Sequence, residues 1–420
     1  MNQTNQSNKN KVNCNAFQKW SSVHPDKLPF PPFELNMALA EGAPVPQGPT
    51  RVNLEKWLSQ ISSVEAIVDE GCKSNQYSDP IDSTGNVDLG LMTNSNMLIS
   101  NVNNSRILKV KLFLESGKFS QVSEQISRIL DVARTGDGGT RVVISYLSGY
   151  RTTIKSGLQS VRECLYFLKC PESVLTHLVD LLVGLDHRAV IAKSVTAECN
   201  FLLSQSAEPY FLNVQDSQLT EGNPAGKEIL QKLLKEHANS RDLNATIGLM
   251  RSLTQETANN ALLAPGKRSA PKLNELRHEL APLLQALNSG KPINSGEYSV
   301  LSSKLGKVQN LIGKVFVLEN WEKTFVPIVE AEDRTILQID ATRILVNLNL
   351  FERRMHKLPT SINELVQMKY LPELPRERWA GYELKYSPSA RTLAFELANG
   401  QKFRYEQNKN ELAWKIPQPR

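Results

Sequence analysis

Three consecutive segments near the C-terminus decide the predicted fold: LQIDATRILVNLNLFERRM (residues 337–355), LPTSINEL (358–365) and YLPELP (370–375). In the first segment, apolar residues recur at spacings of three and four, which is typical of an amphipathic helix with one apolar stripe. The apolar positions are Leu337, Ala341, Ile344, Leu345, Leu348, Phe351 and Met355. We therefore predict a long helix that buries one face.

The second and third segments form a proline-punctuated hook after this helix. Pro359 disfavours helical backbone at the residue before it, so the helical run ends there. Ser361 and Glu364 have the spacing of a capping box, in which each side chain accepts a hydrogen bond from the other residue's backbone N–H. We therefore predict a short second helix that begins at Ile362 and stops before Pro372.

Downstream of the hook the apolar period changes to two, which indicates β-strands with one buried face. The alternating apolar residues are Tyr382, Leu384, Tyr386, Leu393, Phe395, Leu397, Phe403, Tyr405, Leu412, Trp414 and Ile416. Asn399-Gly400 is a strong signal for a tight hairpin turn. We predict an antiparallel meander of three or four strands, with one face packed on the 337–355 helix and the other in water.

The rest of the chain is predicted to be helical. Residues 1–50 are rich in Asn and Pro and are typical of an extended arm. Its expected contacts with the body are Trp20, Phe30 and Phe33. Residues 51–330 show helix after helix, separated by Gly-, Ser- and Asn-rich turns, without a fixed-period repeat. The predicted fold class is mainly α: a multi-helix array with a small C-terminal α+β module at 331–420.

Composition and charge bear on several classes of protein. The 420 residues carry a net charge of +6 with alternating signs, which is unlike the concentrated Lys and Arg of a nucleic-acid binder. No run of about 18 apolar residues is present, so we expect no membrane span. The polar, Asn-rich N-terminus lacks the apolar centre of a secretion signal. We expect a soluble chain whose export would need a segment upstream of Met1.

Cysteine usage does not indicate a disulfide framework. The five cysteines, an odd number at irregular spacing, are Cys14, Cys72, Cys164, Cys170 and Cys199. Cys164 and Cys170 lie six residues apart near the end of one predicted helix, so their side chains are expected on different faces. We predict ordinary buried or free thiols.

The sequence contains no motif that predicts catalytic, metal or cofactor chemistry. None of the six His residues forms a pair with zinc-binding helix spacing. Residues 222–228 read GNPAGKE and lack both the spacing and the Ser or Thr after Lys of a phosphate-binding loop. A Gly-x-Ser-x-Gly elbow is absent as well. We predict no catalytic residue, no metal and no cofactor.

A basic and aromatic group of residues around the hook is the candidate partner surface. Its members are Arg353, Arg354, Lys357, Arg376, Arg378, Trp379, Tyr382 and Tyr386. A solvated helix end near the negative end of the helix dipole explains the first basic side chains adequately, and binding to an acidic partner or an anionic lipid surface is the alternative. The aromatic side chains fill either a helix–sheet core or an exposed patch.

The order of segments from residue 337 to 416 resembles the C-terminal module of the major pseudopilins of type II secretion. The shared features are the long helix, the Leu-Pro hook, Tyr-Leu-Pro-x-Leu-Pro, a Trp, a Gly and a Tyr-x-Leu-x-Tyr strand. The stretch is more similar still to the tail of uncharacterised envelope proteins from planctomycete-like bacteria, which combine a helical body with such a tail. The resemblance covers about 80 residues.

The chain also departs from the pseudopilin pattern. Family members usually carry Asp-Pro after the second Leu-Pro, where this chain has Glu377-Arg378. No Asp occurs between Gly381 and Arg420, so the family's calcium site is not expected here. The apolar N-terminal anchor helix of pseudopilins is absent too, so we do not expect a complete pilin subunit.

These observations lead to one hypothesis and two alternatives. The hypothesis is a non-enzymatic interaction or assembly module of the bacterial cell envelope that binds a protein partner. The first alternative is an enzyme with a site in the cleft between helical body and C-terminal module. The second is an accessory factor of a type II secretion or pilus-like system. An envelope location requires an upstream anchor or signal; without one, the expected location is cytoplasmic.

Overall fold

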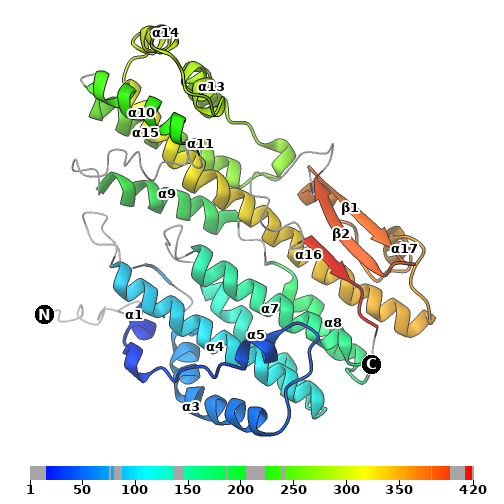
Figure 1. Cartoon of the computed structure of the whole chain (residues 1–420). Helices are drawn as coiled ribbons and strands as arrows, with labels where there is room; N and C mark the ends of the chain where they lie inside the picture. The colour runs from blue at the N-terminus through cyan, green and yellow to red at the C-terminus, as the bar shows by residue number, and fades with distance from the viewer. Residues whose placement is uncertain are drawn as a thin grey trace, which may run out of the picture.

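The computed structural model shows a mainly helical protein with a small three-stranded antiparallel sheet near the C-terminus (Figure 1). The described residues are 16–74, 77–79, 88–135, 146–185, 188–204, 223–238, 242–379, 381–397 and 412–418. This architecture confirms the predicted fold class at that level. Across these residues, no helix combines the length and the apolar character needed to cross a bilayer.

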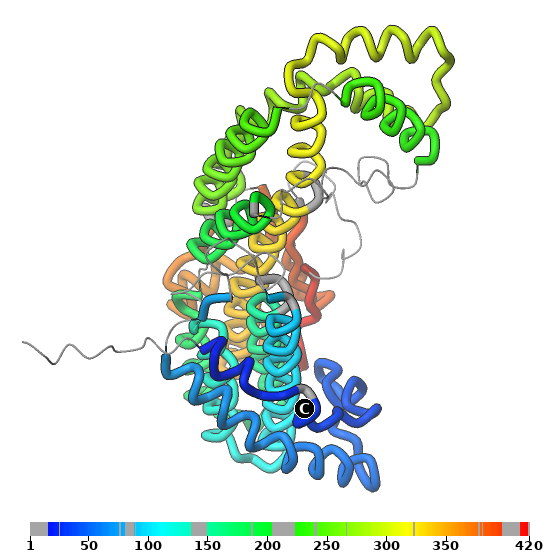
Figure 2. The backbone as a smooth tube through the Cα atoms, turned by 90° about the vertical axis from the view of Figure 1, so that its left-hand side faces the viewer, coloured from blue at the N-terminus to red at the C-terminus, as the bar shows by residue number. Residues whose placement is uncertain are grey.

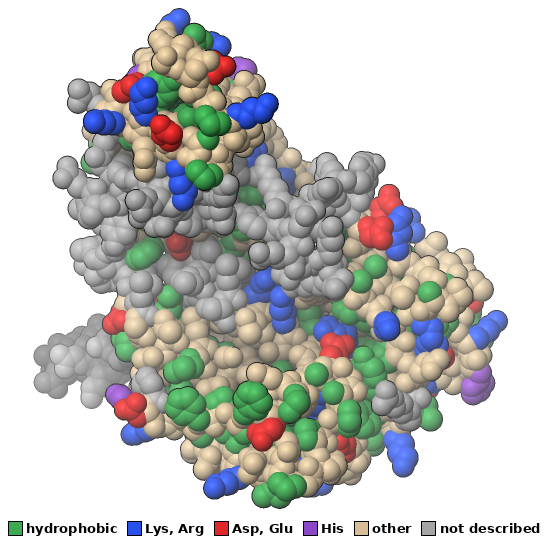
Figure 3. Space-filling model, in the orientation of Figure 1, with side chains coloured by type: hydrophobic (Ala, Val, Ile, Leu, Met, Phe, Trp, Pro, Cys, Tyr) green, Lys and Arg blue, Asp and Glu red, His purple; other side chains and the backbone are tan. Residues whose placement is uncertain are grey.

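The molecule is elongated, and one helical axis runs along it (Figure 1 and Figure 2). Helix α15 (Leu311–Asn320), the π-helical turn η8 (Trp321–Phe325) and helix α16 (Val326–Met355) follow one another along this axis. The N-terminal helices lie at one end, residues 224–305 lie at the other, and the sheet lies beside α16. On the face shown in Figure 3, Lys and Arg side chains are scattered among Asp and Glu.

The N-terminal part has its own hydrophobic core. Its helices are α1 (Ala16–Ser21), η1 (Pro25–Lys27), α2 (Leu35–Leu39), α3 (Pro49–Cys72), α4 (Leu89–Glu115) and α5 (Phe119–Thr135). Trp20 is fully buried, and its indole Nε1 donates a 3.2 Å hydrogen bond to the Val68 carbonyl oxygen. Phe30 and Phe33 are 95% and 93% exposed, so their predicted contact with the body is wrong. Two short helices also replace part of the expected extended arm.

Among the middle helices, one ends earlier than the sequence predicts. They are η2 (Tyr146–Arg151), α7 (Thr152–Glu163), η3 (Cys164–Tyr166), α8 (Glu172–Leu182) and α9 (Arg188–Ser204). The helix expected to continue to Cys170 ends at Glu163, and a 3-10 turn and a loop follow. Phe167 has extended backbone, with φ of −110° and ψ of 106°, so the helical run has stopped before Pro171.

The far end of the molecule is built from short helices. They are α10 (Pro224–Glu236), α11 (Leu243–Ala261), η7 (Pro265–Lys267), α12 (Pro271–Glu279), α13 (Ala281–Asn288) and α14 (Ser295–Leu305). The apolar spacing from Tyr298 to Trp321 predicts one long helix, but the structure has a break between α14 and α15. Asn310 adopts left-handed backbone there, with φ of 51°, and its side-chain oxygen accepts a 2.9 Å hydrogen bond from the Asp242 N–H. This tertiary contact stabilises the break.

The C-terminal module contains the predicted hook and meander. Its elements are α17 (Ile362–Gln367), η9 (Arg376–Trp379), β1 (Tyr382–Ser387), β2 (Thr392–Leu397) and β3 (Ala413–Lys415). The strand order is β1-β2-β3, and both pairs are antiparallel, with Leu384 opposite Phe395 and Leu393 opposite Trp414. The expected Asn399-Gly400 turn and the Phe403–Tyr405 segment lie outside the described residues.

The expected capping box at the start of α17 is wrong. Ser361 is the N-cap residue, but its side chain accepts no capping hydrogen bond. Glu364 instead reaches one residue further back, where its Oε2 accepts 2.7 Å and 3.1 Å bonds from the backbone N and Oγ1 of Thr360. The carboxylate therefore fixes the turn that leads into α17.

Helix α16 is buried on all faces between residues 331 and 351, not along one stripe. The predicted apolar positions are inside except Met355, which is 41% exposed. Polar side chains on the other faces are buried as well: Glu332, Asp333, Gln338, Asp340, Thr342, Asn347 and Asn349. Helices α7, α8, α9 and α17 and strand β2 all contact α16. The prediction of a one-sided amphipathic helix is therefore wrong.

Candidate functional site

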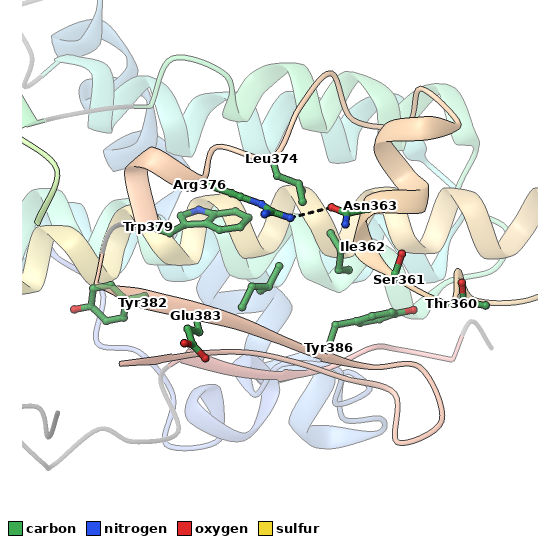
Figure 4. A pocket seen from close by; sticks show the side chains of 11 residues that line it. Thr360, Ser361, Ile362, Asn363, Leu374, Arg376, Trp379, Tyr382, Glu383 and Tyr386 are labelled. Atoms are coloured by element: carbon green, nitrogen blue, oxygen red, sulfur yellow. Dashed lines mark hydrogen bonds between the residues drawn. The ribbon is translucent and has the colours of Figure 1, made fainter. Parts of the chain in front are cut away.

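The candidate site is a pocket of about 510 Å³ between the hook and strand β1 (Figure 4). Residues 360–363 at the start of α17 form one wall, Leu374 and η9 form another, and β1 forms the third. Four residues of the predicted partner surface line it: Arg376, Trp379, Tyr382 and Tyr386. Arg353, Arg354 and Lys357 do not, so the predicted surface is divided.

Trp379 is the fixed wall of the pocket. It is 4% exposed, and its indole Nε1 donates a 2.9 Å hydrogen bond to Oδ2 of Asp340 on α16. Its ring meets Phe395 of β2 edge-to-face, with centroids 5.0 Å apart. Trp379 therefore belongs both to the core and to the pocket wall.

Tyr382, Leu384 and Tyr386 alternate along β1 and point to one side, because side chains of a strand alternate between its faces. The Tyr386 hydroxyl donates a 2.8 Å hydrogen bond to the Pro359 carbonyl oxygen, which ties β1 to the hook. Burial raises the pKa of Tyr386 to about 12 and raises that of Tyr382 as well. Both phenols are therefore neutral near pH 7, and the proton of Tyr386 is already donated to Pro359.

Arg376 supplies positive charge at the rim. Its Nη2 donates a 3.1 Å hydrogen bond to Oδ1 of Asn363, which aims the guanidinium across the pocket mouth (Figure 4). Among the side chains that the structure describes, no carboxylate forms an ion pair with Arg376. An exposed guanidinium without a counter-ion favours a ligand with a carboxylate.

Strand β1 is the edge of the sheet. It pairs with β2 on one side only, and no described residue pairs with its other side. An edge strand offers a row of backbone N–H and C=O groups to another extended chain. Here that row borders the pocket, so backbone hydrogen-bonding groups and side-chain space occur together.

The basic residues at the end of α16 have other tasks. The guanidinium of Arg353 donates to the carbonyl oxygens of Phe167, Leu168 and Cys170 in the loop before α8. Arg354 forms a 2.7 Å ion pair with Glu172. These two residues therefore hold the body to α16.

The last two members of the predicted surface are Lys357 and Arg378. Lys357 is exposed beyond the end of α16. Arg378 lies in η9, but its side chain is outside the described set. The described basic residues that the sequence grouped together thus have different surroundings.

Sequence reasoning missed the hook as part of the site. Thr360, Ser361 and Asn363 line the pocket, although their spacing indicated only a helix start. The pairing of Asn363 with Arg376 joins residues 13 apart. No periodic pattern connects residues of a helix start with a 3-10 turn at that separation, so the sequence carried no signal for it.

Two buried carboxyl groups have raised pKa values, and neither lines the pocket. Burial raises the pKa of Asp333, although Arg268 donates to both its oxygens at 2.6 and 2.7 Å. Burial also raises the pKa of Glu163 to about 7, with Lys111 Nζ 3.2 Å away. Within the described ranges, no group of three or more potential ligands could hold a metal ion.

The pocket therefore offers shape, hydrogen-bonding groups, the Arg376 cation and the Glu383 carboxylate, which accepts a 2.6 Å bond from Lys385. These are means of recognition. Known proteins add no further guide to its ligand. No family model, no curated protein and no solved structure matches this chain.

Proposed function

We propose that the protein is a non-enzymatic interaction module whose pocket binds an extended segment of a protein partner. The observation that carries the proposal is the position of the β1 edge beside the pocket. An extended segment would add as a strand to β1, and backbone hydrogen bonds would supply much of the affinity. This mode needs no conformational change in the sheet.

The pocket lining defines the chemistry of the partner segment. Alternate side chains of an added strand face the same side, so every second residue would point into the pocket. An apolar or aromatic residue would lie against Leu384 and Tyr382, and an acidic residue would pair with Arg376. The volume of about 510 Å³ is in the usual range for a side-chain-sized ligand site.

We also propose that α16 and the meander form one unit that presents this site. Two contacts support it. Arg391, after β1, donates to both carboxylate oxygens of Glu352 at 2.7 and 2.8 Å, and Trp379 bonds Asp340. Such a unit would hold β1 at a fixed distance from the hook.

The cellular setting that we propose is the bacterial envelope. Its support is the resemblance of residues 337–416 to pseudopilin tails, which belong to envelope assemblies. A partner that offers an extended segment fits an assembly role, because assembling subunits commonly exchange strands. The proposal for the pocket does not depend on this location.

The test is a panning experiment with short displayed peptides on the full chain, followed by solution binding. We expect enriched peptides to alternate apolar residues and to include an acidic residue. Arg376→Glu should weaken their binding at least tenfold, or about 1.4 kcal/mol. Lys357→Glu is the matched control, because it makes the same charge change on an exposed side chain outside the pocket, and it should bind like the wild type.

Hydrogen exchange on the same complexes locates the peptide. Binding should protect the backbone amides of 382–387 that face away from β2. If peptides bind wild type and Arg376→Glu equally, or protect only other segments, the pocket is not the binding site.

A further inference from the structure

Three segments meet at the end of α16. Arg353 donates a 3.2 Å hydrogen bond to the Leu168 carbonyl oxygen in the loop before α8. The guanidinium of Arg354 pairs with Glu172 at the start of α8, and its central carbon lies 5.6 Å from the ring centre of Tyr370 in the turn after α17. The end of α16 and helix α17 lie at the same end of the molecule (Figure 1). The three segments therefore form one surface, which we call the tip. Its members are Leu168, Lys169, Met355, Lys357, Met368 and Lys369.

The tip exposes three large apolar side chains. Leu168, Met355 and Met368 are 56%, 41% and 49% exposed. Each belongs to a different one of the three segments, so the apolar area does not come from a single element. Exposed apolar residues are usually scattered singly over a protein surface, and a group of them marks an interaction site.

One exposed lysine accompanies each of these apolar side chains. Lys169, Lys357 and Lys369 lie one or two residues after them in sequence. Among the described residues, no carboxylate forms an ion pair with any of the three. Arg353 and Arg354, in contrast, are engaged within the protein. The charge available to a ligand is therefore that of the lysines.

Helix dipoles account for only part of this charge. Lys357 and Lys369 follow the C-terminal ends of α16 and α17, where the negative end of the dipole favours a cation. Lys169 lies before the N-terminus of α8, where the positive end of the dipole disfavours a cation. The position of Lys169 therefore fits an external anion better than it fits stabilisation of the fold.

We propose that the tip is a peripheral docking site for an anionic lipid bilayer. The three lysines would lie among the negatively charged headgroups, and the three apolar side chains would enter the boundary between headgroups and acyl chains. A bilayer offers both chemistries over a broad surface and needs no complementary pocket. An acidic polypeptide would pair with the lysines but would leave the apolar side chains in water.

The inference goes beyond the proposed peptide binding and does not depend on it. No member of the tip lines the pocket beside β1. The lipid surface that the sequence offered as an alternative involved Arg353 and Arg354, whereas the structure moves the contact to the lysines and their apolar neighbours. Both sites in one chain would bind a partner segment at a membrane surface.

The test is co-sedimentation of the full chain with vesicles of phosphatidylcholine, prepared with or without phosphatidylglycerol. We expect binding to the anionic vesicles, weakened by salt because exposed charges are screened. Lys357→Glu/Lys369→Glu should bind these vesicles about tenfold more weakly. Lys304→Glu/Lys307→Glu is the matched control, because it makes the same charge change on exposed lysines at the end of α14, and it should bind like the wild type.

Met368→Ser measures the apolar contribution. It should weaken binding about threefold or more, and this loss should persist at high salt. The displayed peptides should bind Lys357→Glu/Lys369→Glu as they bind the wild type, so that failure of peptide binding and failure of membrane binding are separate results.

The proposal is wrong if the wild type does not bind anionic vesicles, or if the two double variants bind them equally. Soluble polyglutamate is the probe for an acidic polypeptide. If the wild type binds polyglutamate through these lysines but does not bind vesicles, the tip is a site for an acidic protein and not for a bilayer.

Discussion

The indole Nε1 of Trp379 donates a 2.9 Å hydrogen bond to the Asp340 carboxylate, and both side chains are buried. The two residues are 39 apart in sequence. The bond joins the wall of the pocket to the middle of α16. A buried carboxylate that loses a donor retains its desolvation penalty, so this contact should matter for stability.

We expect Trp379→Phe to lower the free energy of unfolding by about 2 kcal/mol or more, because the hydrogen bond to a charged group is lost. Urea denaturation measures the change. Trp414→Phe is the control, since Trp414 is half-buried and makes no hydrogen bond through its indole to any described residue. Equal losses in the two variants would show that the bond to Asp340 contributes little.

The bidentate ion pair between Arg391 and Glu352 should determine the local stability of the sheet. Arg391 also donates to the carbonyl oxygens of Ile416 and Pro417, so one guanidinium joins β3 to α16. Arg391→Lys keeps the charge but cannot make this planar set of bonds. We expect amide exchange in β2 to accelerate about tenfold, an opening free energy lower by about 1.4 kcal/mol. If amide exchange in β2 is unchanged in Arg391→Lys, a positive charge at this position is enough to stabilise the sheet.

Stability should fall as pH rises through the range in which Glu163 titrates. Its folded pKa of about 7 lies above the unfolded value of 4.5, so the folded state binds more protons between these values. The associated stability is complete below pH 4.5 and is lost as pH rises through 7. The shift corresponds to about 3 kcal/mol.

Denaturation at pH 5 and pH 8 measures this dependence. Glu163→Gln should flatten it, because the amide does not titrate. Glu275→Gln, which makes the same change at an exposed position of α12, should keep the wild-type slope. A wild-type curve without a fall between the two pH values would contradict the raised pKa.

Gly42 should tolerate no side chain. Its φ is +72°, and an added Cβ would lie 2.8 Å from the Tyr166 ring. Gly48 has a similar φ of +67°, but an added Cβ would meet no atom within 4 Å. Its substitution therefore measures the cost of the positive φ without a steric clash. We expect Gly48→Ala to cost about 1 kcal/mol and Gly42→Ala to cost at least about 1 kcal/mol more. Thermal and urea unfolding of both variants provide the comparison.

The sequence predicted the elements of the C-terminal module better than their surroundings. The change of apolar period after the hook located β1 and β2, since strand alternation is a local property. The burial of α16 was not predictable in this way. Asp333 accepts hydrogen bonds from Arg268, and Asp340 accepts one from Trp379. Partners 65 and 39 residues away leave no periodic trace.

The candidate site was predictable in part for the same reason. Trp379, Tyr382 and Tyr386 are close in sequence and meet at the pocket. Arg353 was grouped with them by sequence proximity, but its partners are carbonyl oxygens 183 to 186 residues away. Backbone acceptors have no sequence signature, so this assignment required the fold.

The burial of α16 on all faces decides how the protein can be dissected. A fragment that begins at Leu337 would expose surfaces that α7, α8 and α9 cover, and the remainder would lose the centre of its core. Deletion experiments at this boundary would measure misfolding of both pieces. Point substitutions in the intact chain are therefore more informative than deletions for assigning function to this module.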